Sequence, residues 1–226
     1  MKNKPKHIGI IMDGNRRWAR KRGWPTLKGH QAGYEKMRQV GDWCLNKGIK
    51  ILTVYAFSTE NWNRSKREIS YLMKLLKRAM TVEVKEMHQK NIQVRVIGRT
   101  TELSKDLQKS IKAAVKMTKN NTKGIFNFAI NYGGKPEIVD SVKKILRKKL
   151  PINEKNISAN LYTGDLPEPE IIIRTSGEYR LSNFLTWQSS YSELFFVKKH
   201  WPDFKEKDLD SILKEYKSRN RRFGGN

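Results

Sequence analysis

Short apolar runs alternate with longer amphipathic stretches along almost the whole of this 226-residue chain. Such runs, bounded by turn-forming residues, predict buried strands, and the stretches between them predict helices. Their alternation favours an α/β domain with a central, mostly parallel sheet flanked by helices. We expect six strands, near His7–Met12, Ile51–Phe57, Val94–Ile97, Phe126–Ile130, Ile171–Arg174 and Leu194–Phe196.

The clearest helix is predicted for residues 67–89, where apolar residues recur three and four positions apart. One face of this helix must be buried, and two interpretations stay open: it packs on the sheet, or it forms one wall of an apolar tunnel. Residues 150–169, with three prolines, are typical of a connection that contains a short helix. Because the chain has no repeat and no low-complexity linker, we expect one domain spanning residues 1–226.

The formal net charge of +25 at pH 7 by itself suggests nucleic acid or an anionic membrane as a partner. The positive excess is spread through the first 150 residues, and aromatic residues are not interleaved with it as a nucleic-acid stacking surface requires. We therefore expect no nucleic-acid partner, and attraction to anionic lipid stays open. A solvated helix face is predicted for five lysines at helical spacing: Lys105, Lys109, Lys112, Lys116 and Lys119.

The single cysteine, Cys44, excludes an intrachain disulfide, and we expect it to be a small core residue. No apolar run approaches the ~20 residues of a membrane-spanning helix. The run from Ile8 to Met12 stops at Asp13, which is too short for the apolar part of a secretory signal. The expected location is the cytoplasm, with peripheral contact at a membrane surface as the open alternative.

Polar residues gather directly after four of the predicted strands, in residues 13–18, 58–64, 131–135 and 174–182. In a parallel α/β sheet the carboxyl ends of the strands lie along one edge, where ligands bind. Glycines before a helix expose backbone N–H groups to an anion. Four arginines in these segments would supply paired donors to phosphate oxygens: Arg17, Arg64, Arg174 and Arg180. The sequence therefore predicts a site for more than one phosphate group.

Asp13 differs in charge from its neighbours in these clusters. A carboxylate among arginines would repel phosphate unless a cation lay between them, and Mg²⁺ takes one or two carboxylates together with substrate phosphate oxygens. Asp13 is therefore a candidate Mg²⁺ ligand, with a turn or helix cap as the open alternative. Glu193, at the start of the last strand, is a second candidate, equally compatible with a surface salt bridge.

The familiar phosphate motifs are absent from the sequence. There is no Gly-x-x-x-x-Gly-Lys-Ser/Thr segment, and no Gly-x-Gly-x-x-Gly follows the first strand, so a Rossmann-type dinucleotide site is not expected. The Asp-Asp-x-x-Asp segment of the all-helical trans-prenyltransferases is missing too. A phosphate site of another kind is required.

Eight ordered segments carry a family resemblance: residues 7–23, 29–30, 55–64, 131–134, 173–188, 191–196, 201–204 and 221–225. Together they resemble the successive signatures of the cis-prenyltransferases, the undecaprenyl diphosphate synthase family. The resemblance covers nearly the whole chain in the family's order, and each segment is more specific than a two-residue motif.

The resemblance implies a Mg²⁺-dependent enzyme that condenses isopentenyl diphosphate onto an allylic diphosphate such as farnesyl diphosphate. The implied product is undecaprenyl diphosphate for a cell-wall lipid carrier, and a shorter or different polyprenyl diphosphate is the alternative. The growing chain would occupy an apolar tunnel. The resemblance also implies a homodimer, in which a segment like Arg222-Phe223-Gly224 reaches the neighbouring active site.

The resemblance also implies roles for matching positions. Metal and the allylic diphosphate would be bound around Asp13 by Gly14, Asn15, Arg16, Arg17, Trp18 and His30. A mobile stretch would close over the substrates, with Asn61 serving proton removal, and comprises Ser58, Thr59, Glu60, Asn61, Trp62 and Arg64. The diphosphate of isopentenyl diphosphate would be held by Arg174, Arg180 and Ser182, and Leu181 would be a further substrate-binding residue. Glu193 would complete the metal site.

Two positions depart from the family's pattern. Thr26 stands where arginine is common, so one phosphate contact is either lost or supplied by Lys28, and Arg16 stands where glycine is common. A non-catalytic partner subunit, as some relatives are, would lack the phosphate-binding residues that this chain retains.

Overall fold

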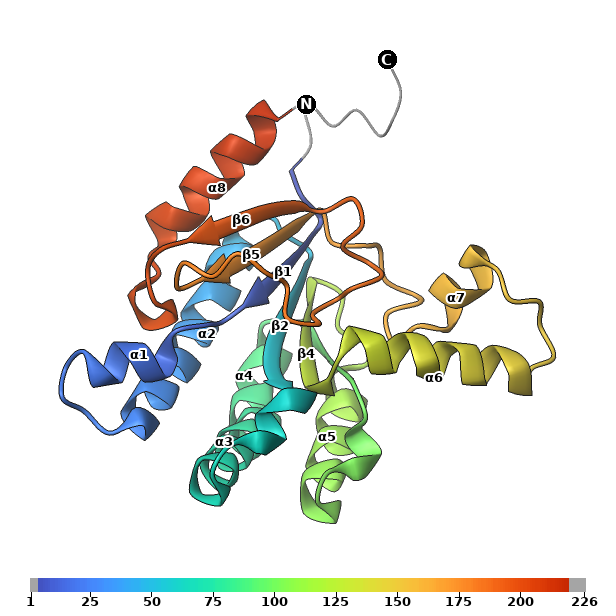
Figure 1. The fold of residues 1–226 in the computed structure, drawn as a ribbon, viewed down its shortest axis with the longest axis horizontal. Coiled ribbons are helices and arrows are strands. Elements are labelled where there is room, and N and C mark those ends of the chain that lie inside the picture. Colours follow the sequence, from blue (N-terminus) through green and yellow to red (C-terminus); the bar gives the residue numbers. More distant parts are fainter. Residues whose placement is uncertain (1–3, 220–226) are drawn as a thin grey trace.

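A computed structural model describes residues 4–219 of the chain. Within this range, six strands form one sheet in the order β3-β4-β2-β1-β5-β6 (Figure 1). The strands are β1 (His7–Ile11), β2 (Ile51–Ser58), β3 (Ile92–Ile97), β4 (Gly124–Tyr132), β5 (Ile171–Thr175) and β6 (Glu193–Val197). Every pairing is parallel, which confirms the predicted α/β class and all six predicted strands. The strand order also differs from that of a Rossmann sheet.

The helices of the described range are α1 (Asn15–Arg20), α2 (Thr26–Asn46), α3 (Lys66–Arg78), α4 (Val84–Gln89), α5 (Lys105–Thr118), α6 (Gly134–Arg147), α7 (Glu154–Asn160) and α8 (Glu206–Ser218). The helix predicted for residues 67–89 is confirmed as α3 and α4, which are joined by the π-helical turn Ala79–Glu83. The connection predicted after residue 150 does contain a short helix, α7.

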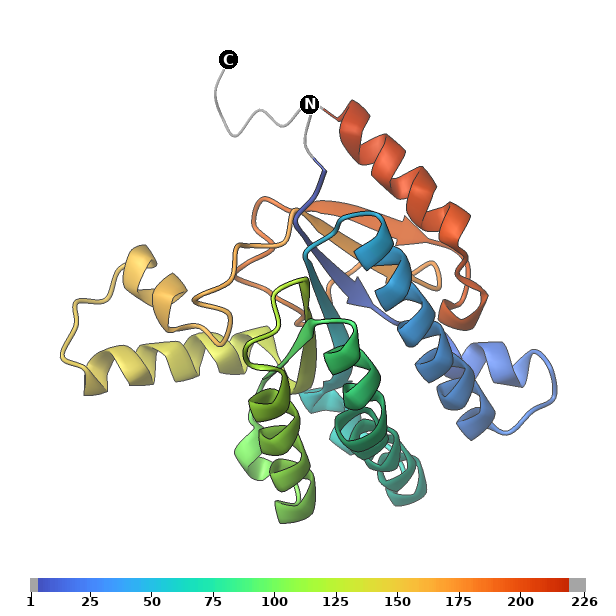
Figure 2. The ribbon, with the colours of Figure 1, turned by 180° about the vertical axis from the view of Figure 1, so that it is seen from behind.

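The two faces of the sheet are covered differently. Helices α2, α3, α4, α5 and α8 pack on one face, which Figure 2 shows from behind. Ile8 and Ile10 point into this larger core, whereas Ile11 points into a smaller core on the opposite face, because side chains alternate along a strand. Among the described residues no helix covers that second face beside Ile11; Phe184 and Leu185, in the chain after β5, pack there instead. The polar segment around them is thereby held close to the strand ends.

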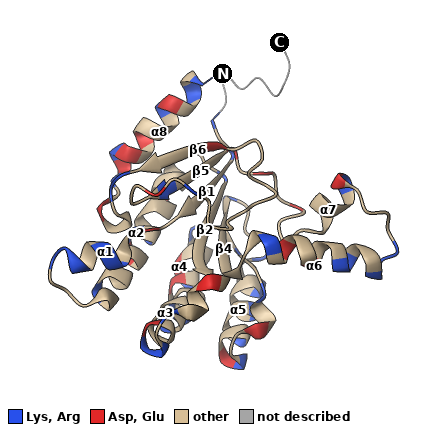
Figure 3. Ribbon diagram, in the orientation of Figure 1, with Lys and Arg blue, Asp and Glu red and all other residues tan. Residues whose placement is uncertain are grey.

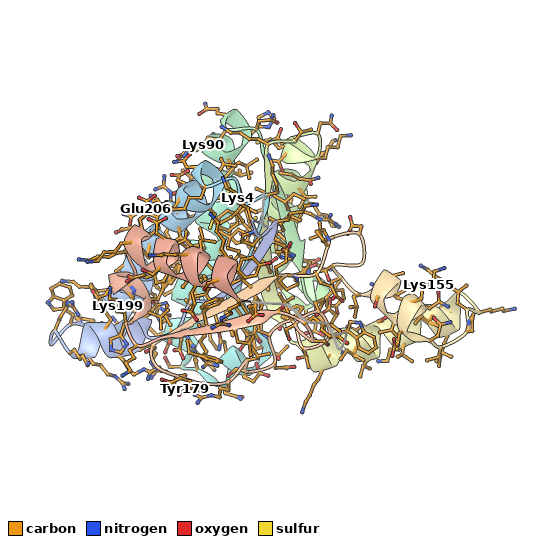
Figure 4. The ribbon with its side chains drawn as sticks, turned by 90° about the horizontal axis from the view of Figure 1, so that it is seen from above. Lys4, Lys90, Lys155, Tyr179, Lys199 and Glu206 are labelled. Atoms are coloured by element: carbon orange, nitrogen blue, oxygen red, sulfur yellow. The ribbon has the colours of Figure 1, made fainter. Side chains whose placement is uncertain are left out.

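Helices α6 and α7 form an arm that projects from the sheet (Figure 1). Lys155, at the start of α7, lies at the far end of this arm from Lys199 and Glu206 (Figure 4). In and beside the arm, several large apolar side chains are exposed: Val139, Leu146, Leu150 and Ile152. Val139 and Leu146 lie seven positions apart on α6 and therefore share one face of that helix, and apolar residues that gather on an exposed face mark interaction sites.

The basic residues are distributed over most helices rather than gathered in one patch (Figure 3). The five lysines on and after α5 are exposed, which confirms their predicted solvated face. Cys44 is buried in the larger core, as predicted. None of the described helices combines the length and the apolar character needed to cross a membrane.

A chain of buried polar groups crosses the sheet near the amino ends of its strands. The imidazole Nε2 of His7 is hydrogen-bonded to the Thr53 hydroxyl at 2.7 Å, and Nδ1 lies 2.7 Å from the carbonyl oxygen of Pro167. Asn127 donates its amide to Thr53 at 3.1 Å. Burial lowers the pKa of His7 from 6.5 to about 4, so the ring is neutral in the folded protein at pH 7.

We expect the free energy of unfolding to fall as the pH drops from 6.5 to about 4. In this window the unfolded chain binds a proton that folded His7 does not, and the difference is worth about 3 kcal/mol. Urea unfolding across the window measures the slope, which His7→Gln should flatten and His88→Gln, at an exposed histidine, should leave unchanged. An equal slope in wild type and His7→Gln would contradict this account.

Candidate active site

Two neighbouring pockets open at the carboxyl edge of the sheet, with volumes of about 390 and 660 Å³. Predicted site residues that line the first are Asp13, Gly14, Asn15, Arg16, Arg17, His30, Asn61 and Arg64. Those that line the second are Ser58, Glu60, Asn61, Leu181 and Ser182. Tyr55 and Asn61 line both pockets, so the two pockets meet at these side chains.

Other predicted residues lie near the pockets without lining them. The indole N–H of Trp18 donates to Asp203 at 2.7 Å, on the side of α1 away from the first pocket. Trp62 is 41% exposed and donates to Asn131 at 2.8 Å. The remaining three are Thr59, Arg174 and Arg180.

Asp13 is the acidic residue of the first pocket. Its Oδ1 accepts the backbone N–H of Gly14 at 2.7 Å, and its Oδ2 lies 2.9 Å from Arg174 and 3.3 Å from Arg17. Partial burial would raise the pKa of Asp13, but the hydrogen bond and charge of Arg174 and the charge of Arg17 outweigh it and lower the pKa. The carboxylate is therefore ionised at neutral pH. About four lone-pair directions exist on a carboxylate, and hydrogen bonds from Gly14 and Arg174 occupy two of them, so the carboxylate can still take a further ligand.

Glu193 does not reach this carboxylate within one chain. It begins β6 and pairs in register with Ile171, whereas Asp13 follows the opposite ends of the neighbouring strands. From Ile171 to Arg174, beside Asp13, is roughly 10 Å along a strand. Glu193 instead accepts a hydrogen bond from Arg219 at 2.6 Å. Within a single chain Glu193 thus forms the salt bridge that was the open alternative, and its role in a metal site with Asp13 stays a prediction.

The side chain of Arg174 forms hydrogen bonds with residues of both pockets. Its side chain is buried, and one Nη donates to the Arg180 carbonyl at 2.5 Å and to Ser182 Oγ at 2.7 Å. The other Nη donates to Asp13, and Nε has no hydrogen-bond partner among the described residues. Arg174 thus fixes Asp13 of the first pocket relative to Ser182 of the second.

Two further arginines are held by one half-buried carboxylate, that of Glu178. Glu178 accepts hydrogen bonds from Arg17 at 2.7 Å and from Arg180 at 2.6 Å. Both arginines belong to strand-end segments of the site, and Arg17 lines the first pocket. Because a phosphate group binds arginine in the same paired fashion as a carboxylate, an anionic ligand would compete with Glu178 for these donors.

His30 and Arg64 share a buried carboxylate that the sequence analysis did not identify. Glu68 on α3 lies 2.9 Å from His30 Nε2 and 3.0 Å from Arg64 Nη1. Burial lowers the pKa of His30 and outweighs the hydrogen bond to Glu68, so the ring is neutral at pH 7. Glu68 thereby orients two pocket residues that come from different helical segments. The only sequence signal for it is the four-residue spacing from Arg64.

The segment after β2 is held by three hydrogen bonds. The backbone N–H of Ser58 donates to the Asn61 side-chain oxygen at 3.2 Å, which fixes the orientation of that amide. Asn183 donates to Glu60 at 3.0 Å, and Trp62 donates to Asn131. These contacts place Asn61 at the boundary between the pockets.

Thr26 and its neighbour supply no contact to the first pocket. Thr26 begins α2, and the Lys28 ammonium lies 5.3 Å from the centre of the Trp24 ring. Neither residue lines either pocket, so the structure does not support replacement of a phosphate contact by Lys28. Arg16 does line the first pocket and therefore adds a charge there.

Residues that the sequence analysis did not single out also line the pockets. Arg20 lies in the first, and Lys135 and Asn183 lie in the second. Arg20 lies one helical turn after Arg16 in α1, and Lys135 follows the Gly-Gly pair after β4, so both had a signal in their spacing. Asn183 had none.

Gly14 forms the turn between β1 and α1 with a φ of +102°, which favours glycine. A Cβ at this position would lie 2.6 Å from Ser176 Oγ and 2.8 Å from His200 Nδ1. We expect Gly14→Ala to lower kcat/KM by more than roughly tenfold, because a shift of about 1 Å at a site costs up to 10²-fold. Gly23→Ala is the control: Gly23 has φ +66° but nothing within 4 Å of its added Cβ. If both variants lost ~1–2 kcal/mol of free energy of unfolding but had equal kcat/KM, the contact of the added Cβ with Ser176 and His200 would have no effect on the site.

Fold and pockets together define a parallel α/β protein with two adjoining pockets at the carboxyl edge of its sheet, the first of them lined by arginines. A family model described as "Putative undecaprenyl diphosphate synthase" matches residues 11–224. The isoprenyl transferase of Clostridium tetani is 48% identical over 99% of this chain and 90% of its own length. That of Fusobacterium nucleatum is 49% identical over 99% of this chain and 97% of its own.

Two solved structures are similar throughout. Lavandulyl diphosphate synthase from Lavandula x intermedia, in complex with dimethylallyl diphosphate, has a TM-score of 0.93 at 37% identity, covering 97% of this chain and 98% of its own. A probable undecaprenyl diphosphate synthase from Campylobacter jejuni has a TM-score of 0.84 at 34% identity, covering 98% and 99%. The chain belongs to the prenyltransferase family of this model and is a prenyl-transferring enzyme.

Proposed function

We propose that this enzyme condenses isopentenyl diphosphate units onto an allylic diphosphate to form a cis-polyprenyl diphosphate. The observation that carries the proposal is the meeting, at Asn61 and Tyr55, of an arginine-lined pocket with a second pocket that contains Lys135. Two diphosphate substrates must be held separately while their reacting carbons meet, and adjoining pockets provide this geometry.

The first pocket suits the allylic diphosphate. It has arginines at its mouth, while Met12, Ala56 and Leu72 supply apolar lining that continues inward. The similar lavandulyl diphosphate synthase was solved with dimethylallyl diphosphate, an allylic diphosphate. The second pocket, with Ser182 and Lys135 as donors, suits isopentenyl diphosphate.

We further propose that the reaction depends on Mg²⁺. The described residues contain no group of three or more His, Cys, Asp or Glu side chains placed to hold a metal on their own. Mg²⁺ commonly binds through one carboxylate, substrate phosphates and waters, and ionised Asp13 with its open lone-pair direction fits that arrangement. When bound, Mg²⁺ would neutralise the charge that develops on the departing pyrophosphate.

The side chains divide the work of the condensation. The double bond of isopentenyl diphosphate attacks the first carbon of the allylic substrate as its bond to the diphosphate oxygen breaks, and a proton then leaves to give the new double bond. Arg17, Arg64 and Arg16 would stabilise the departing pyrophosphate. Asn61 would position the group that takes the proton, because an amide is a poor base and the Asn61 side-chain oxygen already accepts a hydrogen bond from the backbone N–H of Ser58.

We propose undecaprenyl diphosphate as the product, for a cell-wall lipid carrier, and residues 1–226 as one catalytic domain. The exposed apolar residues of the arm, among them Leu146 and Ile152, support a homodimer. The segment Arg222-Phe223-Gly224, expected to reach the neighbouring subunit, lies outside the described residues. A cytoplasmic enzyme that meets anionic membrane peripherally is consistent with the net charge of +25.

Pyrophosphate release tests the function and its metal requirement together. We expect release from farnesyl diphosphate only when isopentenyl diphosphate and Mg²⁺ are both present, and its loss with excess chelator. Release without isopentenyl diphosphate would indicate hydrolysis. Absence of release, together with salt-sensitive RNA binding, would instead favour a nucleic-acid-binding protein.

A further inference from the structure

An apolar cavity leads inward from the first pocket. It has a volume of about 60 Å³ and lies between α2, α3 and the sheet. Five residues line both the cavity and the pocket, which makes the two continuous: Met12, Asn15, His30, Ala56 and Leu72. The apolar tail of a diphosphate held at Asp13 therefore has a direct path between these helices.

The deeper part of this cavity is lined by Tyr34, Leu76, Ala79 and Phe128. Its volume is small beside the ~300–1,000 Å³ of ligand pockets. The described residues between α2 and α3 thus leave only a narrow cavity, and a long chain has to move its walls apart. How far the cavity walls can move depends on which side chains pack behind the deeper residues.

A cluster of three charged side chains lies behind the deeper residues of the cavity: Arg38, Glu83 and Arg78. Glu83 is 5% exposed, and its carboxylate oxygens lie 2.9 Å from Arg38 Nε and 3.2 Å from Arg78 Nε. Glu83 belongs to the π-helical turn and lies between Met80 and Val84, which are buried in the larger core. A carboxylate is seldom buried among such neighbours unless it is paired.

Tyr34 links the cavity to this cluster. It lines the cavity, it is 8% exposed, and its hydroxyl is buried without a hydrogen-bond partner in the described part of the chain. The Arg78 guanidinium lies 6.0 Å from the centre of its ring. Burial, and after it the negative charge of Glu83, raises the pKa of Tyr34, which is consistent with a phenol close to that carboxylate. The apolar lining therefore ends at a polar boundary.

A second hollow, of about 30 Å³, lies on the other side of the cluster. Arg38 and Glu83 line it, and so does Phe126, whose ring stacks on Phe128 of the first cavity at 4.6 Å between centroids. It extends to Lys90 at the end of α4, on the outer surface in Figure 4. Arg38 and Glu83 thus separate an inner apolar cavity from an outer hollow.

We propose that the Arg38–Glu83–Arg78 cluster, together with Tyr34, is the stop that sets the length of the polyprenyl product. This inference rests on the proposed function. A growing chain advances five carbons with each condensation until its end meets Tyr34 and Ala79. Further growth would separate a buried carboxylate from its arginines, which is strongly unfavourable. A small neutral residue at position 83 would open the way to the outer hollow.

The test compares product lengths from Glu83→Ala, Glu83→Gln and wild type, made from the same primer with excess labelled isopentenyl diphosphate. Glu86→Gln is the matched control, because Glu86 pairs with the same Arg38 at 2.7 Å and lines the same outer hollow, but its side chain is 43% exposed whereas Glu83 is buried. We expect the main product to lengthen by at least two five-carbon units in Glu83→Ala and by at least one in Glu83→Gln. The Glu86→Gln products should match those of wild type.

Glu83→Gln keeps the size of the side chain and decides the question if Glu83→Ala does not fold. Unchanged product lengths in a folded Glu83 variant, with or without a lower melting temperature, would contradict the proposal that the cluster limits product length. The cluster would then have a purely structural role. A shift of equal size in Glu86→Gln would also contradict the proposal. If wild type incorporates no isopentenyl diphosphate, the proposed function fails and this inference fails with it.

Discussion

Asp13→Asn should lower the turnover number by roughly 10²–10³-fold, the range for loss of one electrostatic contact in a transition state. Asp13 accepts these two hydrogen bonds on different oxygens, Oδ1 from Gly14 and Oδ2 from Arg174, so the single oxygen of asparagine keeps one of them and its amide N–H₂ replaces the other acceptor. Also lost is the negative charge that allows a cation to lie among the arginines and phosphates. Initial rates of pyrophosphate release over a range of Mg²⁺ concentrations measure the effect.

Glu178→Gln is the matched control for this variant. Glu178 is another carboxylate paired with Arg17, but it lines neither of the two pockets. If any loss of negative charge beside Arg17 were harmful, both variants would be equally impaired. We expect Glu178→Gln to retain turnover within about tenfold, a loss of ~1.4 kcal/mol at most. Near-normal turnover of Asp13→Asn, with unchanged dependence on Mg²⁺, would exclude the proposed metal assignment.

Arg174→Met should lower kcat/KM for both substrates by roughly 10²-fold or more, because the orientation of Asp13 and of Ser182 depends on the same guanidinium. Arg174→Lys is expected to be almost as impaired, since a lysine cannot reproduce the forked geometry. The free energy of unfolding of Arg174→Met should fall by about 2 kcal/mol. This is less than the ~3–5 kcal/mol for breaking a fully buried ion pair, because the Asp13 side chain is 30% exposed.

Arg180→Met is the control that distinguishes the positioning of Asp13 and Ser182 by Arg174 from the simple loss of one positive charge in the site. Arg180 is 61% exposed and pairs with Glu178, so its removal should leave stability within about 0.5 kcal/mol. It should raise KM for isopentenyl diphosphate alone. If Arg174→Met affected only one substrate, as Arg180→Met is expected to do, Arg174 would not couple the two pockets.

The location of the site could be predicted from the sequence, because the carboxyl ends of parallel strands share one edge. Asp13, Ser58 and Ser182 lie close together for this reason, although they come from three strand ends. The same rule argues against Glu193: a residue that begins a parallel strand lies at the opposite edge. Applied to β6, it would have placed Glu193 beside Ile171 and not beside Asp13.

Contacts between distant parts of the chain could not be predicted in this way. Arg174 and Asp13 are 161 residues apart, and nothing in the local sequence shows that this arginine turns inward while Arg180 turns outward. The role of Glu68 is hidden for the same reason, because its neighbours on α3 indicate only a helix face. The cavity between α2 and α3 depends on side-chain packing, which an apolar periodicity does not specify.

The most direct measurement of the central claim is incorporation of ¹³C-labelled isopentenyl diphosphate, followed by NMR of the double bonds in the extracted product. The purified enzyme is incubated with farnesyl diphosphate and Mg²⁺. We predict a polyprenyl diphosphate in which every newly added double bond is cis. A product with trans additions, or no labelled chain at all, would contradict the assignment of these two pockets to cis-prenyl elongation.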